Sequence, residues 1–140
     1  MKNGVMKMKN KRQRKKYAKQ HGTYVDYKET WNLDCTIAKF IIPRLKLYKK
    51  VINGYPGRLN SIEQWYEIID KMIYSFTYFT EDHDIDFSDP DWKDKEKSEY
   101  EKVKDGLKLF AEYYAGLWWW VVMITAKEAY RIAKVKDNKG

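Results

Sequence analysis

Carboxylates at alternating positions are the first feature of the sequence that suggests chemistry. Asp82, Asp84 and Asp86 have the spacing of the first three ligands of a calcium-binding loop, where carboxylates converge on one hard cation. The match then fails, because Phe87 stands where that loop needs glycine, and a lysine replaces its bidentate glutamate. We therefore expect residues 81–91 to form a solvated acidic linker, which could alternatively pair with a basic segment elsewhere in the chain.

Groups that could perform catalysis lack the partners that catalysis needs. His83 lies between two aspartates, and Glu67 and Asp70 lie three residues apart, but no nucleophile or oxyanion donor accompanies them. The single cysteine, Cys35, has no zinc-ligand spacing to the two histidines and fits a small core residue better than a nucleophile. Phosphate-cradling glycine motifs and nucleophile elbows are also missing. The sequence therefore predicts a non-enzymatic protein with no cofactor and no metal.

The clearest functional feature is a basic segment at the start of the chain. Residues 1–21 contain seven Lys, two Arg and no acid. Removing these nine cations from the 28 in the chain leaves 19 against 20 acids, so the net charge of +8 belongs to this segment. Such cations suit phosphates, which position a protein without reading base sequence, although a solubility tail is an equal alternative. The candidate binding residues are Lys9, Lys11, Arg12, Arg14, Lys15, Lys16 and Lys19.

A second group of cations is interleaved with aromatic residues. This pattern suits stacking and charge contacts with a nucleotide, a single-stranded nucleic acid or an acidic protein surface. The alternative is that the aromatic residues belong to the core and the lysines to an ordinary solvated face. The members of this predicted basic/aromatic face are Trp31, Lys39, Arg44, Lys46, Tyr48, Lys49, Lys50, Tyr55 and Arg58.

Two helices are predicted in the first half of the chain. Apolar residues recur at three- and four-residue steps over residues 32–53, where Asn53-Gly54 predicts a left-handed stop. Pro43 predicts a kink or two shorter helices. The second helix is expected over residues 61–80, with Ser61 and Gln64 spaced as a capping box.

A long helix is predicted from about Trp92, with Asp91 as its cap and a break or bend near Gly106 or Gly116. Residues 117–124 are ambiguous, because aromatic and β-branched residues favour strands while helical patterns continue on both sides. We interpret them as helix. Successive residues on a helix turn by roughly 100°, so at least one of Trp118, Trp119 and Trp120 should face away from the core and offer a surface for self-association.

The predicted fold is all-α: a small helical bundle of three to four helices with a flexible basic N-terminal arm. We expect the arm at residues 1–22 and a single helical domain at residues 23–140. A lone cysteine indicates a reducing compartment, and the longest apolar run, of about 12 residues, is too short to span a bilayer. The expected location is therefore the cytoplasm, with no membrane partner.

Several short motifs, taken together, resemble small proteins encoded by tailed phages and prophages of Gram-positive bacteria. The resemblance covers about residues 28–120 and implies a phage product made in a bacterial host cytoplasm, with no catalytic residue to transfer. Such accessory proteins commonly act by binding, and some block host defence. The motifs are Trp65 and residues 29–34, 36–38, 43–45, 54–56, 70–73 and 117–118.

Three functions follow from these observations. The leading expectation is a non-enzymatic phage accessory protein that binds a host nucleic-acid machine or defence complex, as an anti-CRISPR or other counter-defence inhibitor. The partner is then a host protein or a protein–nucleic-acid complex. The first alternative is direct binding of DNA or RNA, and the second is sequestration of a nucleotide signal in an aromatic and basic pocket.

Overall fold

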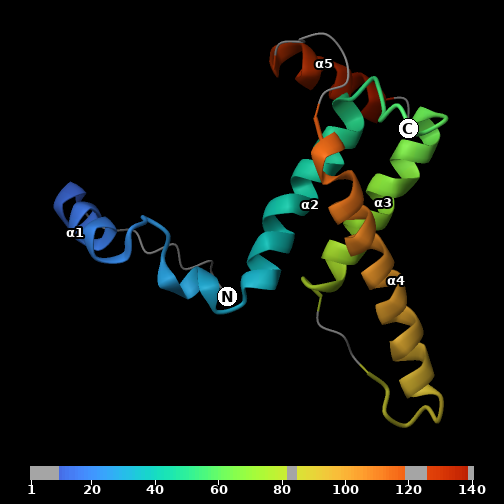
Figure 1. Cartoon of the computed structure of the whole chain (residues 1–140), viewed down its shortest axis with the longest axis horizontal. Helices are drawn as coiled ribbons and strands as arrows, with labels where there is room; N and C mark the ends of the chain where they lie inside the picture. Colours follow the sequence, from blue (N-terminus) through green and yellow to red (C-terminus); the bar gives the residue numbers. More distant parts are fainter. Residues whose placement is uncertain (1–9, 82–84, 119–125, 139–140) are drawn as a thin grey trace. The chain divides into compact units, whose positions relative to one another are not determined.

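The computed structural model describes residues 10–81, 85–118 and 126–138 (Figure 1). All regular secondary structure in these ranges is helical. The chain divides into two compact units, residues 1–37 and 38–140, with the boundary inside a helix. The all-α prediction is confirmed, but five α-helices in these ranges exceed the predicted three to four. The elements are α1 (Lys11–His21), η1 (Tyr27–Thr30, a 3-10 helix), α2 (Leu33–Val51), α3 (Ile62–Tyr78), α4 (Trp92–Tyr113), η2 (Tyr114–Gly116, 3-10) and α5 (Ala126–Asp137).

Helix α1 replaces most of the predicted flexible arm. The Asn10 side chain accepts a hydrogen bond from the Gln13 backbone N–H at 2.9 Å, which caps the first turn. At the other end Gly22 adopts φ 70°, and its N–H donates to the Ala18 carbonyl at 2.8 Å. Residues 11–21 are thus helical because both helix ends find partners. Lys9 and the rest of residues 1–9 lie outside the described residues.

The core of the second unit forms where α2, α3 and α4 meet. Trp65 of α3 is fully buried, with the Tyr48 ring of α2 edge-on at 6.3 Å and the Tyr113 ring of α4 at 5.5 Å. Apolar side chains from all three helices surround this aromatic centre, which accounts for the apolar periodicity of the sequence. Its other buried members are Ala38, Leu45, Ile52, Leu59, Ile68, Ile69, Met72 and Phe76.

Helix α2 is a single helix that contains Pro43. The predicted division into two helices at this proline is therefore wrong, since core contacts on both sides of it hold the helix together. The predicted left-handed stop at Gly54 is also wrong. Among the residues that the structure describes, Gly22 alone has a positive φ, and α2 ends at Val51 without a left-handed cap.

Helix α3 begins as the sequence predicts, with one difference. The Ser61 hydroxyl accepts from the Gln64 N–H at 3.2 Å. The Gln64 side chain, however, accepts from the N–H of Asn60 at 3.0 Å, one residue before the position that a capping box requires. The helix start is fixed by two reciprocal bonds all the same.

Helix α4 runs unbroken through Gly106, one of the two positions near which a break or bend is predicted. A Cβ at this position would lie 1.8 Å from Ser75 Oγ and 2.3 Å from the Lys71 carbonyl oxygen, so glycine is needed for close approach to α3. The buried Ser75 hydroxyl donates to the Val103 carbonyl at 2.8 Å in the same contact. The helix ends at Tyr113 and is followed by η2, so the predicted break lies near Gly116. Asp91 stands at the N-cap position as predicted, but its side chain makes no cap bond.

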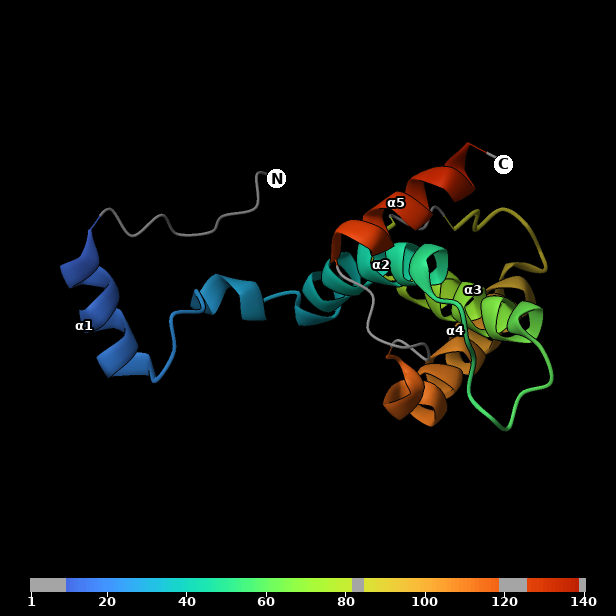
Figure 2. The ribbon, with the colours of Figure 1, turned by 90° about the horizontal axis from the view of Figure 1, so that it is seen from above.

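Helix α5 lies against the end of α2 (Figure 2). Ala133 packs on Val51, and the Lys136 ammonium donates to the Ile52 carbonyl and to the Tyr66 hydroxyl at 3.5 and 3.3 Å. Leu117 and Trp118, which the sequence predicts as helix, are not helical, so the chain is not continuously helical from α4 to α5. Trp119, Trp120 and the remainder of the ambiguous segment lie outside the described residues.

Substitution of Gly106 tests the close approach of α3 and α4. We expect Gly106→Ala to lower the free energy of unfolding by about 1–3 kcal/mol, because the methyl group meets backbone at Lys71 that cannot rotate away. Gly57→Ala is the control, since a Cβ there meets nothing within 4 Å. Urea unfolding measures both, and equal midpoints for the two variants would contradict the proposed contact.

Candidate nucleic-acid interface

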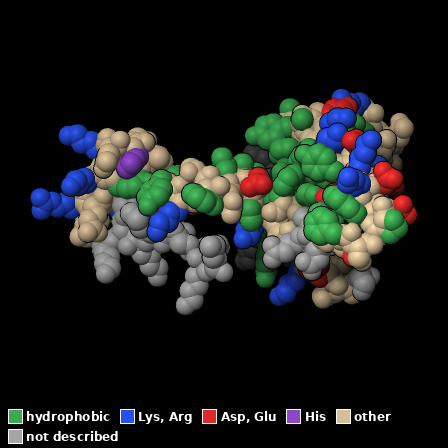
Figure 3. Space-filling model, turned by 90° about the horizontal axis from the view of Figure 1, so that it is seen from below, with side chains coloured by type: hydrophobic (Ala, Val, Ile, Leu, Met, Phe, Trp, Pro, Cys, Tyr) green, Lys and Arg blue, Asp and Glu red, His purple; other side chains and the backbone are tan. Residues whose placement is uncertain are grey.

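The cations of α1 gather on one face of the helix. At about 100° per residue, Lys11, Lys15, Lys19, Arg12 and Lys16 fall within an arc of roughly 140°. These are five of the six Lys and Arg residues of α1, and all are exposed. In Figure 3 the Lys and Arg side chains project from this helix with no acidic side chain among them. We call these five residues the α1 basic face.

The opposite side of α1 is fastened to the segment that follows it. The Tyr17 hydroxyl donates to the Val25 carbonyl at 2.6 Å and accepts from the Tyr27 N–H at 2.9 Å. The Tyr17 ring also lies 4.4 Å from the His21 ring, and the Arg14 guanidinium lies 5.3 Å from the ring of Tyr24. These contacts turn the α1 basic face away from the first unit's own backbone.

The segment after α1 is ordered by η1, whose capping box is complete. Asp26 is buried, and its carboxylate accepts from the Lys28 N–H at 3.0 Å, while Glu29 accepts from the Asp26 N–H at 3.1 Å. Despite this order, the aromatic and aliphatic side chains nearby are solvated. Trp31 is 87% exposed, which places it on the surface and not in a core. The other large apolar residues exposed among residues 10–37 are Tyr24, Val25, Tyr27, Leu33 and Ile37.

Three cations of the predicted basic/aromatic face are engaged within the protein. Lys49 contacts both carboxylate oxygens of Asp70 at 2.9 Å, and Lys50 forms an ion pair with Asp137. Arg58 donates to the Glu112 carbonyl at 3.0 Å and lies 4.1 Å above the Tyr113 ring. These side chains join α2 and its following loop to α3, α4 and α5.

The remaining members of that predicted face divide between packing and solvent. The Tyr48 hydroxyl donates to the carbonyls of Gly116 and Trp118 at 3.3 and 3.0 Å, so Tyr48 fastens the chain after α4. Arg44 folds back on the Phe40 ring at 3.7 Å and donates to the Phe40 carbonyl. The members of this face in the second unit that stay exposed to solvent are Lys39, Lys46 and Tyr55 (36%). Trp118, which was predicted separately as a surface for self-association, is 53% exposed.

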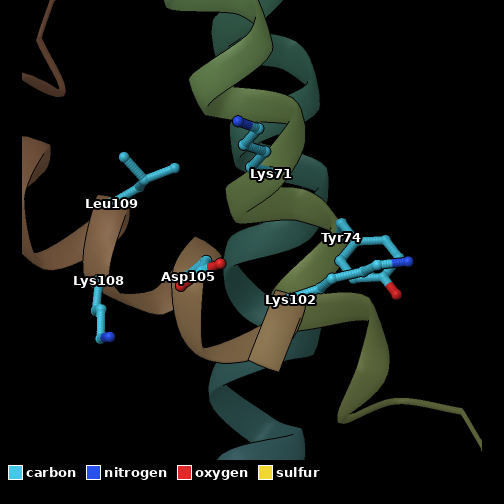
Figure 4. Close-up of a pocket in the computed structure, with 6 residues that line it drawn as sticks. All are labelled: Lys71, Tyr74, Lys102, Asp105, Lys108 and Leu109. Atoms are coloured by element: carbon cyan, nitrogen blue, oxygen red, sulfur yellow. The ribbon is translucent and has the colours of Figure 1, made fainter. Parts of the chain in front are cut away.

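A groove of about 570 Å³ between α3 and α4 was not predicted from the sequence. Its walls carry three cations, one acid and two apolar surfaces, and in Figure 4 Asp105 points toward α3 while Lys102 extends toward Tyr74. The residues come from positions about 30 apart in the chain, so spacing along the sequence gave no signal for it. The lining residues are Lys71, Tyr74, Lys102, Asp105, Lys108 and Leu109.

Carboxylates of α4 orient two tyrosines of α3. Tyr74 donates to Glu99, and this bond, followed by burial, raises the pKa of Tyr74 to about 12. Tyr78 donates to Glu96 at 2.8 Å, and that bond likewise raises the pKa of Tyr78. Both phenols therefore stay protonated at neutral pH, and the ring of Tyr74 is held at the groove.

The described residues form neither a cluster of metal ligands nor a helix that could span a membrane. In residues 10–81, 85–118 and 126–138 no three His, Cys, Asp or Glu side chains converge as metal ligands. Asp86 of the acidic segment instead accepts hydrogen bonds from the backbone N–H and the hydroxyl of Ser88, while Asp82 and Asp84 lie outside these ranges. None of the helices within them is long and apolar enough to cross a bilayer.

Comparisons of the chain with protein-family models, with curated proteins and with solved structures found no match.

Removal of the Tyr17 hydroxyl tests how α1 is held. We expect Tyr17→Phe to reduce amide-exchange protection in residues 11–21 about tenfold, because two hydrogen bonds worth about 1 kcal/mol or less each are lost while the ring remains. Tyr27→Phe is the matched control, since the Tyr27 hydroxyl has no hydrogen-bond partner among the described residues. Equal protection in both variants would show that Tyr17 does not hold the helix.

Titration of Tyr74 tests its bond to Glu99. We expect Glu99→Gln to lower the Tyr74 pKa from about 12 toward the ordinary value of 10, measured by ¹³Cζ NMR. Because the pKa in the folded protein is raised, the bond's contribution to stability is full below pH 10 and is lost as the pH rises through about 12. Glu101→Gln, which removes a carboxylate paired with Lys104, should leave the titration unchanged.

Proposed function

We propose that the protein is a non-enzymatic accessory protein of phage origin that binds a host nucleic-acid machine through the first unit. The α1 basic face contacts phosphates in this proposal. Its support is one observation: five exposed cations lie on one face of a capped helix, with no acid in the helix and no ion pair to any described residue. Unpaired cations can release the counterions of a nucleic acid when they bind.

The lysines of the second unit are less suited to this role. Lys49, Lys50 and Arg58 would have to give up carboxylate partners before they could bind phosphates. Of the binding residues predicted from the sequence, we therefore keep those of α1 and Trp31 as the proposed binding surface. Lys39 and Lys46 are exposed on α2.

A composite partner of protein and nucleic acid fits the first unit better than free nucleic acid alone. Trp31 at 87% exposure and the neighbouring Tyr27 at 61% add apolar surface that phosphates do not satisfy. Aromatic anchors of this kind dominate protein–protein binding energy. Host defence complexes that hold nucleic acid offer both kinds of surface, which is why counter-defence inhibition is the favoured role.

Capture from a bacterial lysate, with and without nuclease, distinguishes this role from direct DNA or RNA binding. We expect a host protein to be recovered in both samples, at reduced yield after nuclease. Recovery that depends wholly on intact nucleic acid would favour the direct-binding alternative. Trp31→Ala should reduce recovery of the protein partner, whereas Trp92→Ala, in the second unit, should not.

The salt dependence of duplex DNA binding tests the α1 basic face directly. Each phosphate contact contributes about 0.9 to the slope of log affinity against log salt, so Lys11→Gln, Lys15→Gln and Lys19→Gln together should reduce its magnitude by about 2.7. The control is Lys39→Gln, Lys46→Gln and Lys97→Gln, which removes equal charge from exposed positions of the second unit. If both triple variants lose the same slope, net charge and not α1 carries the binding.

A further inference from the structure

We propose that the groove between α3 and α4 binds a nucleotide, with its base against Tyr74 and its phosphates among Lys71, Lys102 and Lys108. None of the residues that line the groove belongs to α1. Its volume of about 570 Å³ lies in the range of small-molecule sites, roughly 300–1,000 Å³. The groove also combines an apolar wall with a few charged groups, as such sites commonly do.

Charge in the groove matches a phosphate ligand. Three lysines and one aspartate line it, so its lining carries a net charge of +2. None of these three lysines forms an ion pair with another described residue. The nearby Lys104, in contrast, forms an ion pair with Glu101 at 2.8 Å. The three lysines extend in different directions in Figure 4, but lysine acts on phosphate as a point charge on a flexible stem, so their side chains would turn toward a bound diphosphate.

The ring of Tyr74 supplies what a nucleotide needs beyond charge. It is 41% exposed at the groove, and its hydroxyl is occupied by Glu99, which fixes the ring while leaving surface for contact. Stacking of a base on an aromatic ring contributes about 1–3 kcal/mol in single-strand complexes. Asp105 can accept hydrogen bonds from a base amino group or a ribose hydroxyl. Inorganic phosphate has neither group and could not make these hydrogen bonds.

An acidic peptide helix is the competing occupant, and the groove fits it less well. The groove spans Lys102 to Leu109 on α4, about 10 Å of helix, whereas a docking helix of 12–15 residues is about 20 Å long. Asp105 lies in the middle of this span and would repel an acidic helix. A compact ligand can place its phosphates on the lysines and avoid that carboxylate.

Calorimetric titration of the full chain with ADP tests the site. We expect Lys71→Ala and Lys102→Ala each to weaken ADP binding about tenfold, since a hydrogen bond to a charged group is lost. Lys97→Ala, on α4 but outside the groove, should bind ADP as the unmodified chain does. Tyr74→Leu should weaken binding about tenfold, and Tyr74→Phe, which keeps the ring, should weaken it far less.

Several results would overturn the proposal. No heat of binding at millimolar ADP would do so, as would equal affinity for inorganic pyrophosphate and ADP, because the base would then contribute nothing. Displacement of ADP by a 15-residue Glu-rich peptide at lower concentration would assign the groove to an acidic helix. Loss of ADP binding on triple substitution of Lys11, Lys15 and Lys19 to Gln would place the nucleotide on α1.

Discussion

The second unit depends on the close approach of α3 and α4 at Gly106. No side chain separates the two helices there, so Ser75 reaches the Val103 carbonyl and the backbones set the spacing of the pair. That spacing brings the Tyr113 ring of α4 against the Trp65 ring of α3. It also lets Tyr74 and Tyr78 of α3 donate hydrogen bonds to glutamates of α4. The groove follows from the same contact, because its walls are the outer edges of these two helices.

The division of positive charge follows from which lysines have acids within reach. Exposed ion pairs such as Lys49–Asp70 contribute about 0–1 kcal/mol to stability. Their larger effect is to neutralise cations that the sequence alone presents as available. In α1 no acid is present within the helix, and the nearest acids of the first unit, Asp26 and Glu29, are used to cap η1. The cations that remain without an ion pair are therefore fewer than the composition of the chain indicates, and those of α1 are among them.

Only some of the features decided by neighbours in sequence were predictable, and features decided by distant contacts were not. The Ser61 cap forms as predicted, but the left-handed stop predicted at Gly54 is found at Gly22, after a helix that the sequence did not predict. The order of α1 depends on Tyr17 bonding to backbone groups 8 and 10 residues away, which no side-chain pattern reveals. A sequence cannot show the opposing helix, so it does not distinguish Gly106, which allows close packing on α3, from Gly116, near which the helix ends. The groove was missed for the same reason, since its walls come from two helices. The sequence alone also left open whether Trp31 is buried in a core or exposed on the surface.

The lysines of the α1 basic face repel one another, and a bound anion would reduce this repulsion. Lys11, Lys15 and Lys19 follow one another at four-residue steps, where like charges destabilise a helix by about 0.2–0.5 kcal/mol per pair. An 11-residue helix is marginal in water, and α1 buries no side chain of its own. Phosphates on this face would remove the repulsion, so binding and helix formation must favour each other. The caps and the two Tyr17 hydrogen bonds order the helix in the absence of a ligand, and in the proposed complex bound phosphates would stabilise it further.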